Sequence, residues 1–529
     1  MQELTKQYPL IKLIEIDNLA YLYDARSSFI AEIEKKYIFE GRNKTTIKPN
    51  LIDKFEKLEF LKKGGFDKVV PDDNELKGIV EYQLNSYIPR KFTIEVTENC
   101  NLKCKYCFFS KEEKSTVRKH SCRNMEIETA KKAIDFYYNF YTSQLMKVPE
   151  NKRKKLISLC PPIMSWWGGE PFLAFDIIKE SKKYFDSLNW KKFNINIKQN
   201  KFTYFLASNL TIMNEEIAEF LVNNNIILHV SLDGDKEEND KNRVFDKGKG
   251  TFEIIIKNLE YLINKYPKYA KTSIIIQSVA ADNIDVEKSY NFITKFFKYN
   301  TPESKISKSM FAPQKKEKVL FSDSYVIDER DELEKFKIKL SSLVEETEEK
   351  LTQRLMYDNK LFKDLSELFL LERELEFENP QNIFFKSNLF SCPIEADGVF
   401  VAVNGDFHMC MKYDYSFPFG NVHTEVDKNA IVNIYKNHIS GFREKCKNCW
   451  AINFCPVCPA QILYEKQFYF PTNKDCDIIK LKSSIALKKY ILFTNNKILY
   501  NNVKNIFKKS KFDNYILDTG PININNLKF

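Results

Sequence analysis

The sequence predicts an α/β protein, with a parallel sheet or barrel in the middle of the chain, a small α+β domain before it and a cysteine-rich domain after it. Three observations lead to this prediction. Strands and helices alternate over residues 86–315, cysteines gather in two clusters, and the composition changes on both sides of the alternating region. The length of 529 residues agrees, because one ordinary hydrophobic core does not accommodate so long a chain.

The alternating region, residues 86–315, contains a series of expected strands, each followed by a helical stretch. Such βα repetition produces a parallel sheet or barrel whose functional loops follow the carboxyl ends of the strands. The candidate motifs lie where the chain leaves a strand, so the pattern and the motifs agree. The expected strands are Phe92–Val96, Pro162–Trp167, Phe202–Ala207, Ile226–Ser231 and Thr272–Gln277.

Residues 1–85 are expected to form a separate winged-helix-like α+β domain. Ile11–Ile16 and Ala20–Tyr23 are β-rich, and Asp17-Asn18 supplies the turn between them. A helix is expected to begin with Asn50 as its N-cap. Strands followed by short helices are typical of winged-helix-like modules.

The second half of the chain divides into three expected parts. Residues 316–385 are charged and helix-prone, which predicts a helical bridge with a solvated face. Residues 386–485 are richer in glycine and cysteine and contain β-like runs such as Val399–Val403. Residues 486–529 form a basic C-terminal segment.

Composition and charge limit the class of protein. A hydrophobic content of 43% indicates a globular chain, and the start MQELTKQYPL has no apolar signal-peptide core. No window reaches the roughly 18 uncharged apolar residues of a membrane span. The net charge of +10 comes from scattered lysines, which we interpret as a solvated surface and not as a nucleic-acid patch. We therefore expect a cytoplasmic protein without a membrane or nucleic-acid partner, whose clustered cysteines bind metal.

The first cysteine cluster is Cys100, Cys104 and Cys107, a C-x3-C-x2-C directly after an expected strand. Three thiolates hold three corners of a [4Fe–4S] cube and leave the fourth iron open to a small chelating molecule. S-adenosylmethionine (SAM) suits such an iron, because its amino and carboxylate groups form a chelate. The alternative is a zinc knuckle, for which His120 and Cys122 are the nearby fourth ligands.

The segment Cys100-Asn-Leu-Lys-Cys104-Lys-Tyr-Cys107 resembles the signature of the radical SAM superfamily. This resemblance implies a partial (β/α)6 TIM-like barrel and a catalytic role for the three cysteines. It also implies reductive cleavage of SAM to a 5′-deoxyadenosyl radical, chemistry that the cofactor supplies and the protein orients. An electron donor such as flavodoxin or ferredoxin is implied as a partner.

Further motifs agree with the superfamily. Gly168-Gly169-Glu170-Pro171 resembles the loop that binds the amino group of SAM, although a simple turn is the alternative. Leu210 replaces the glycine that usually follows Asn209, and Arg243 has a surface salt bridge as its alternative role. The SAM-binding residues that the resemblance implies are Tyr106, Gly168, Gly169, Glu170, Asn209, Ser231, Asp233 and Arg243.

The second cysteine cluster resembles the SPASM domain, which carries two auxiliary [4Fe–4S] clusters and would bring the total to three. The resemblance implies an outer cluster held by four cysteines and an inner cluster held by three. The fourth ligand of the inner cluster is either a substrate thiolate or a residue from elsewhere, and residues 446–458 alone also fit a zinc ribbon. The outer set is Cys446, Cys449, Cys455 and Cys476, and the inner set is Cys392, Cys410 and Cys458. Cys122 and Cys160 fall outside both patterns and are expected to be ordinary thiols.

These resemblances imply a maturase of a ribosomally made precursor peptide. Residues 1–85 match the outline of a RiPP recognition element, in which the leader of the precursor adds a strand to a sheet edge. The favoured product is a Cys thioether crosslink. The nearest alternative is an anaerobic sulfatase-maturating (formylglycine-forming) enzyme, but Met411 follows Cys410 where those enzymes are expected to carry an aspartate. An alternative of another class is a zinc-ribbon nucleic-acid-binding protein.

Overall fold

The computed structural model describes most of the chain between residues 8 and 509. Cys392 and Cys458 lie outside the described residues, as does most of the predicted bridge over 316–385. The described residues are 8–17, 19–27, 29–34, 37–41, 44–57, 63–64, 71–86, 88–89, 91–107, 109, 119–196, 204–279, 284–297, 307–309, 328–347, 349–351, 365, 368, 399–411, 413, 415–440, 446–455, 457, 462–464 and 467–509.

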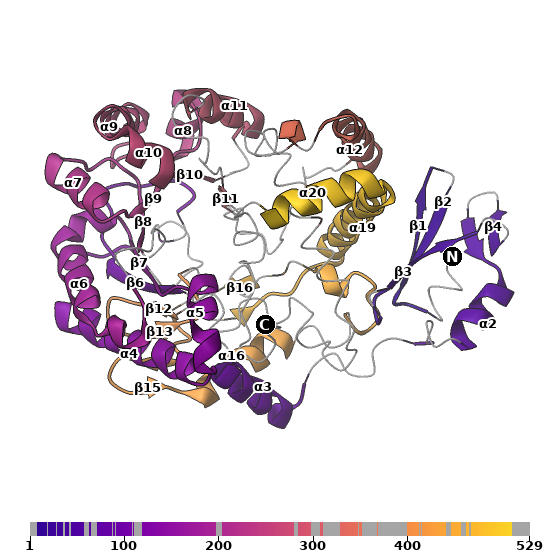
Figure 1. Cartoon of the computed structure of the whole chain (residues 1–529), viewed down its shortest axis with the longest axis horizontal. Coiled ribbons are helices and arrows are strands. Elements are labelled where there is room, and N and C mark those ends of the chain that lie inside the picture. The colour runs from indigo at the N-terminus through magenta and orange to yellow at the C-terminus, as the bar shows by residue number, and fades with distance from the viewer. Residues whose placement is uncertain are drawn as a thin grey trace.

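A parallel sheet forms the centre of the fold and confirms the predicted α/β class. Neighbouring strands from β6 to β11 all pair in parallel, and their order in the sheet follows their order in the chain. Helices cover the outer side of this curved sheet (Figure 1). The strands are β6 (Lys91–Thr97), β7 (Ile163–Gly168), β8 (Tyr204–Ser208), β9 (Ile227–Ser231), β10 (Ile274–Val279) and β11 (Ser307–Ser309).

Alternating side chains give the sheet two different faces. Phe92 on β6 stacks on Tyr137 of α4, with ring centroids 5.1 Å apart. Trp166 on β7 donates its indole N–H to Ser181 of α6 at 2.9 Å. Because side chains alternate along a strand, the residues between these face the opposite, inner side of the sheet. The helices between β6 and β11 in the chain are α4 (Ile127–Met146), α5 (Glu150–Leu159), α6 (Phe175–Ser187), α7 (Glu215–Asn223), α8 (Lys236–Asn242), α9 (Phe252–Lys265), α10 (Pro267–Ser273) and α11 (Val286–Phe297).

Strands from the C-terminal part extend the same sheet beyond β6. β12 (Val399–Val401) pairs with β6 in parallel, and β13 (Phe407–His408) pairs with β12 in an antiparallel way. The β-like run expected at Val399–Val403 thus forms a strand of the central sheet.

Two details of the predicted elements are wrong. The strand expected at Thr272–Gln277 begins at Ile274, because α10 starts at Pro267 and includes Thr272. Proline suits the first turn of a helix, where its missing N–H has no partner to lose. For the same reason α2 (Pro49–Lys57) begins at Pro49, so Asn50 lies within the helix and is not its cap.

The N-terminal part contains a three-stranded antiparallel sheet of β1 (Ile11–Ile16), β2 (Leu19–Asp24) and β3 (Phe29–Ile33). Asp17 occupies the left-handed region, with φ of 53°, in the predicted turn. A hairpin of β4 (Ile38–Gly41) and β5 (Lys44–Ile47) and the helices α2 and α3 (Asp73–Ser86) follow.

Helices of the C-terminal part pack against earlier helices of the chain. In α16 (Lys428–Ile439), the Tyr435 hydroxyl donates to Gln83 of α3 at 3.0 Å. α19 (Asn473–Asn495) contacts α12 (Glu329–Val344) through an ion pair between Lys489 and Glu332.

No helix in the described ranges is long and apolar enough to cross a bilayer. The remaining elements are η2 (Pro171–Ala174), η3 (Trp190–Phe193), β14 (Gly420–Asn421), β15 (Glu425–Val426), η8 (Ile452–Phe454), β16 (Leu463–Tyr464), β17 (Gln467–Phe468) and α20 (Lys497–Lys509).

Candidate functional site

The first cysteine cluster lies at the carboxyl end of β6, as predicted. Cys100, Cys104 and Cys107 are half-buried, and none of these three forms a disulfide. Burial raises the pKa of the Cys104 thiol to about 12; the Arg243 guanidinium opposes this effect, and Cys107 adds to it. The cysteines are therefore close enough to influence one another's charge.

The cysteine thiols fit an iron–sulfur cluster by their chemistry. Among the residues described, no three Cys, His, Asp or Glu side chains converge on a single point as the ligands of one metal ion would. In a [4Fe–4S] cube each thiolate binds a different iron, so its cysteines need not converge in this way. The raised pKa means that the Cys104 thiol carries its proton near pH 7 in the chain without metal. Binding of iron would displace this proton.

Backbone pairing holds the cysteine loop against the segment that carries Arg243. The Lys103 N–H donates to the Val244 carbonyl at 2.8 Å, and the Lys105 N–H donates to the Asn242 carbonyl at 2.9 Å. The loop is thus paired on both sides of Cys104, and this pairing places Arg243 beside it.

Tyr106, Asp233 and Arg243 form a buried polar group behind the loop. The Tyr106 hydroxyl donates to Asp233 Oδ2 at 2.5 Å, and Arg243 Nε lies 3.1 Å from the same oxygen. The Arg243 guanidinium also lies 5.4 Å from the centre of the Tyr106 ring. The other carboxylate oxygen of Asp233 accepts the Val279 N–H at 2.9 Å. These residues are brought together as predicted, but in this structure they bind one another.

The glycines of the Gly168-Gly169-Glu170 segment allow it to lie against the start of the cysteine loop. A Cβ atom on Gly169 would lie 2.1 Å from the Asn99 carbonyl oxygen, and one on Gly168 would lie 2.3 Å from the Thr97 carbonyl oxygen. The Gly169 N–H donates to Thr97 and the Glu170 N–H donates to Asn99. Close approach of the backbone therefore requires glycine at both positions.

Glu170 is fully buried and joins the ends of β7 and β8. Its carboxylate accepts hydrogen bonds from the Phe172 N–H at 3.1 Å, the Ser208 hydroxyl at 2.8 Å and the Asn209 N–H at 2.7 Å. Burial raises the pKa of this carboxyl to about 7, against the effect of these donors. A carboxylate accepts about four hydrogen bonds, so one acceptor position is left for a further donor such as an ammonium.

Asn209 links the cysteine loop to the segment after β8. Its side-chain amide donates to Asn101 at 2.9 Å, and Asn101 in turn donates to the Thr211 hydroxyl at 2.8 Å. Leu210 has a φ of 55° and is fully buried. The left-handed backbone that glycine would favour is therefore kept here with a leucine.

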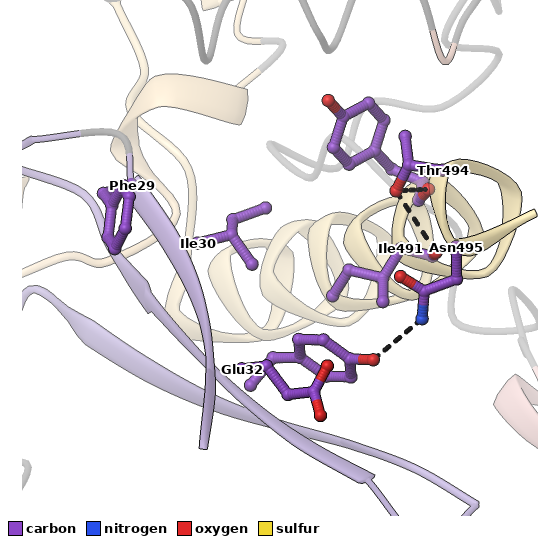
Figure 2. Close-up of a pocket in the computed structure, with 8 residues that line it drawn as sticks. Phe29, Ile30, Glu32, Ile491, Thr494 and Asn495 are labelled. Carbon is purple, nitrogen blue, oxygen red and sulfur yellow. Dashed lines mark hydrogen bonds between the residues drawn. The ribbon is translucent and has the colours of Figure 1, made fainter. Parts of the chain in front are cut away.

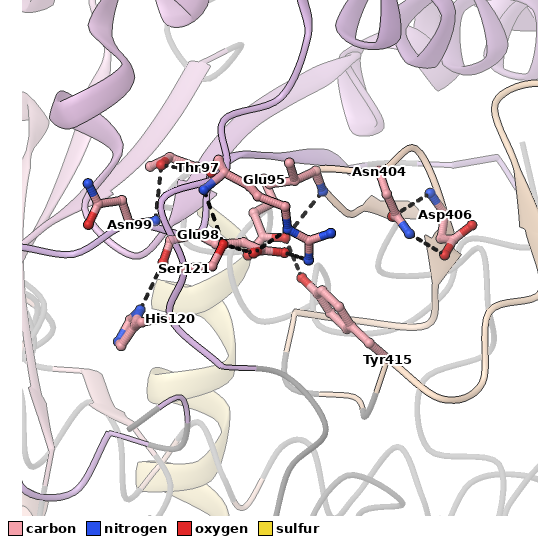
Figure 3. Close-up of polar contacts among 11 residues, drawn as sticks. Glu95, Thr97, Glu98, Asn99, His120, Ser121, Asn404, Asp406 and Tyr415 are labelled. Carbon is pink, nitrogen blue, oxygen red and sulfur yellow. Dashed lines mark hydrogen bonds and ion pairs between the residues drawn. The ribbon is translucent and has the colours of Figure 1, made fainter. Parts of the chain in front are cut away.

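A second polar group at the end of β6 was missed in the sequence. Arg123 donates to both Glu98 carboxylate oxygens, at 2.9 and 2.6 Å, and the Ser121 hydroxyl donates to the same carboxylate (Figure 3). His120 Nδ1 lies 2.9 Å from the Glu98 carbonyl oxygen, and its Nε2 lies 3.4 Å from Cys107 Sγ. The spacing of His120 from the cysteines was the only sequence signal for this group.

Polar residues also lie on the inner face of the sheet. Glu95 on β6 is fully buried and accepts the Tyr415 hydroxyl at 2.6 Å, which joins the sheet to the C-terminal part (Figure 3). His229 on β9 is a second such residue, and burial lowers the pKa of its imidazole to about 4, so it is neutral near pH 7. Its Nε2 atom is buried and has no hydrogen-bond partner within the described ranges.

Three cysteines of the predicted outer set, Cys449, Cys455 and Cys476, lie near one another in the C-terminal part. Burial raises the pKa of Cys455 to about 12, and the nearby Cys449 and Cys476 raise it further. Cys449 also donates its N–H to the Cys446 carbonyl at 3.1 Å. Of the predicted inner set, Cys410 is half-buried, and Cys392 and Cys458 lie outside the described residues.

A groove separates the N-terminal sheet from α19. In the part of the chain that the structure describes, β3 pairs with β2 on one side only, so it is an edge strand, and its side chains line the groove together with those of α19. Figure 2 shows Phe29, Ile30 and Glu32 across the groove from Ile491, Thr494 and Asn495. The groove has a volume of about 390 Å³, and Tyr21 and Tyr490 complete its lining.

Several known proteins are similar to this chain. The cysteine-type anaerobic sulfatase-maturating enzyme of Clostridium novyi is 24% identical over 389 residues, which are 72% of this chain and 90% of that enzyme. The radical SAM cyclopropyl synthase TigE of Paramaledivibacter caminithermalis is 22% identical over 53% of this chain and 56% of its own length. The solved structure of native anSMEcpe with bound AdoMet has a TM-score of 0.49 and 20% identity, covering 77% of this chain and 99% of that one. Residues 94–292 match the Radical SAM superfamily, so the chain carries a radical SAM domain.

Proposed function

We propose that this chain is a radical SAM maturase that installs a crosslink, most favourably a Cys thioether, in a ribosomally made precursor peptide. The observation that carries the proposal is the convergence of four segments at one edge of the sheet. The cysteine loop, the Gly168-Gly169-Glu170 segment, Asn209 and the Asp233–Arg243 pair contact one another there. A [4Fe–4S] cluster held by Cys100, Cys104 and Cys107 would supply the reductive cleavage of SAM to a 5′-deoxyadenosyl radical.

The protein's part in this reaction is to position the substrate groups and exclude water. Glu170 has one free acceptor position, which suits the ammonium of SAM, and its pKa of about 7 allows it to carry charge at neutral pH. Tyr106 presents an aromatic ring beside the loop, held by Asp233, where an adenine would stack. The remaining SAM contacts are assigned to Gly168, Gly169, Asn209, Ser231, Asp233 and Arg243.

Two auxiliary [4Fe–4S] clusters are part of the proposal. The outer one would be held by Cys446, Cys449, Cys455 and Cys476, of which the last three influence one another's charge. The inner one is assigned to Cys392, Cys410 and Cys458, and its fourth ligand would be a substrate thiolate or a residue from elsewhere in the chain. An electron donor such as flavodoxin or ferredoxin would reduce the clusters.

The N-terminal part would hold the leader of the precursor as a RiPP recognition element does. Its support is the edge of β3, whose backbone offers a row of donors and acceptors to an added strand. The groove beside this edge is lined by apolar and polar side chains from β3 and α19. An extended peptide with apolar side chains is the ligand that suits it.

A formylglycine-forming sulfatase maturase is the second candidate. The alignment with the Clostridium novyi enzyme over 90% of its length favours it. Both reactions begin with hydrogen abstraction from a peptide, so the radical site does not separate them. Met411 after Cys410, in place of an aspartate, favours the thioether.

Mass spectrometry of peptides separates the two candidates. The short reading frames beside this gene would be co-expressed with the chain, and a cysteine-containing sulfatase-type peptide would be offered in parallel. We expect the neighbouring peptide to lose a pair of hydrogens for each thioether formed. Conversion of the sulfatase-type cysteine to an aldehyde, with no change in the neighbouring peptides, would favour the second candidate.

A zinc-ribbon protein remains the alternative of another class. Metal and sulfide analysis of anaerobically purified protein distinguishes this zinc-ribbon alternative from the proposed enzyme. Three cubes require about twelve irons per chain with matching sulfide, at four irons per cluster. Zinc without acid-labile sulfide would contradict the proposed function.

A further inference from the structure

Asn453 lies in the middle of the loop that joins Cys449 to Cys455, within the short helix η8. It is 5% exposed, and its side-chain amide donates to two groups of β2 and the turn after it. The acceptors are the Tyr23 hydroxyl at 3.1 Å and the Ala25 carbonyl at 2.7 Å. The two donor hydrogens of the amide therefore connect a cysteine loop to a strand more than 400 residues earlier in the chain.

Aromatic packing surrounds this connection. The Tyr23 side chain is fully buried, and its ring contacts Phe454 at a centroid distance of 5.3 Å and Trp450 at 6.4 Å. The Lys12 ammonium lies 5.3 Å from the centre of the Trp450 ring. Side chains of β1 and β2 thus pack against the loop that carries two of the outer cysteines.

The loop has little regular structure of its own. Its backbone bonds span single turns, from Cys449 to Cys446 at 3.1 Å, from Ile452 to Cys449 at 3.2 Å and from Cys455 to Ile452 at 3.3 Å. These short turns follow one another, and within the described residues 446–455 they do not form a long helix, so the direction of each thiol also depends on the groups around the loop. Metal ligands depend on surrounding groups for their orientation, and Asn453 connects this loop to a rigid sheet.

We propose that Asn453 is a positioning residue of the outer cysteine site, with β2 as its support. It orients the backbone between Cys449 and Cys455 so that their thiols meet Cys446 and Cys476. The inference rests on the proposed function, because the cluster at these four cysteines is part of it. The N-terminal sheet would then support the loop of the outer cysteine site, in addition to any role in leader binding.

The chain offers a matched control for general docking of the N-terminal sheet. Asn495 on α19 donates to the Tyr21 hydroxyl at 2.8 Å, and so makes an equivalent Asn–Tyr bond to the same strand. Asn495 lies at the far end of α19 from Cys476. A substitution there weakens the contact of the sheet without touching the cysteine loop.

The test uses the full chain with Cys100, Cys104 and Cys107 replaced by alanine, so that only the auxiliary sites hold iron. After anaerobic reconstitution with iron and sulfide, the readouts are iron content, the electron paramagnetic resonance spectrum and the rate of iron release to a chelator. We expect N453A and N453D to release iron about tenfold faster, because both lose the two donated hydrogen bonds. Y23F removes one bond and is expected to give about a threefold increase, whereas N495A leaves the rate unchanged.

The outcomes separate this inference from the proposed function. If the chain with the three alanine replacements binds no iron and sulfide, the proposed auxiliary clusters and this inference are both wrong. If the triple-alanine chain binds iron and sulfide, and N453A in that chain leaves the iron release rate and the spectrum unchanged, this inference alone is overturned. An equal effect of N495A also overturns it, because general docking then explains the result. The melting temperature of each variant is measured in parallel, and if N453A does not fold, Y23F decides.

Discussion

Arg243 and Asp233 form a buried ion pair directly behind the cysteine loop, with 3.1 Å between Arg243 Nε and Asp233 Oδ2. Both side chains are more than nine-tenths buried. The same carboxylate accepts a hydrogen bond from the hydroxyl of Tyr106, which lies between Cys104 and Cys107 in the sequence. The pair therefore connects the segment after β9 to the loop that would carry the cluster, which gives Arg243 a structural task in addition to any contact with SAM.

Replacing Asp233 by asparagine should destabilise the chain by roughly 3–5 kcal/mol, because Arg243 is left as an unpaired buried charge. Urea unfolding measures the difference. The double variant D233L/R243M should recover part of this loss, since removal of both partners leaves no buried charge. A loss below about 1 kcal/mol in D233N would show that Arg243 is compensated by other groups.

Replacing Gly169 by alanine should abolish iron binding at the first cluster. The new Cβ would lie 2.1 Å from the Asn99 carbonyl oxygen, so the backbone next to Cys100 must move. Iron and sulfide content after reconstitution measures the effect. Gly78 in α3 is the control, because a Cβ there meets nothing within 4 Å and alanine favours a helix. Iron content equal to that of G78A would contradict the account of this segment.

The stability of the chain without ligands should fall as the pH rises from about 5 to 7. The pKa of Glu170 is raised to about 7 by burial, so the folded state holds a proton that the unfolded state has released. The contribution is about 1.4 kcal/mol for each pH unit in this window, and about 3 kcal/mol in total. Urea unfolding of the wild-type chain and of E170Q at several pH values isolates the contribution of Glu170. The variant should lack this part of the pH dependence of the unfolding free energy. Equal slopes in both proteins would contradict the raised pKa.

Replacing Leu210 by glycine should destabilise the chain although it relieves a left-handed backbone. The strain at φ of 55° is worth about 1–2 kcal/mol. Removing a fully buried leucine side chain costs about 2–5 kcal/mol, so the cavity outweighs the relief. The free energy of unfolding decides, and a stabilised L210G would show that the strain is larger than the packing.

The local part of the architecture was predictable from the sequence. The βα order of β6 to β10 and the position of each motif after a strand depend on short-range patterns, which a sequence displays directly. The Gly168-Gly169-Glu170 segment was found in this way. The conformation of Leu210 was foreseen only as a departure from glycine.

Contacts between distant segments were not predictable. The pairing of β12 with β6 and the hydrogen bond from Tyr415 to Glu95 join residues about 300 positions apart, and no local pattern encodes such a pairing. The bond from Asn453 to Tyr23 is of the same kind. Two prolines also displaced predicted boundaries, at α2 and α10.

Reductive cleavage of SAM is the reaction that the proposed radical site must perform, so its product is the best single test of the proposed function. The reconstituted chain is incubated anaerobically with SAM and a strong reductant, and 5′-deoxyadenosine is measured by liquid chromatography and mass spectrometry. We expect 5′-deoxyadenosine from the wild-type chain and from C122A, whose thiol is exposed and outside both cysteine clusters, and none from C104A. No 5′-deoxyadenosine from a wild-type chain loaded with iron and sulfide, or equal amounts from C104A, would contradict it.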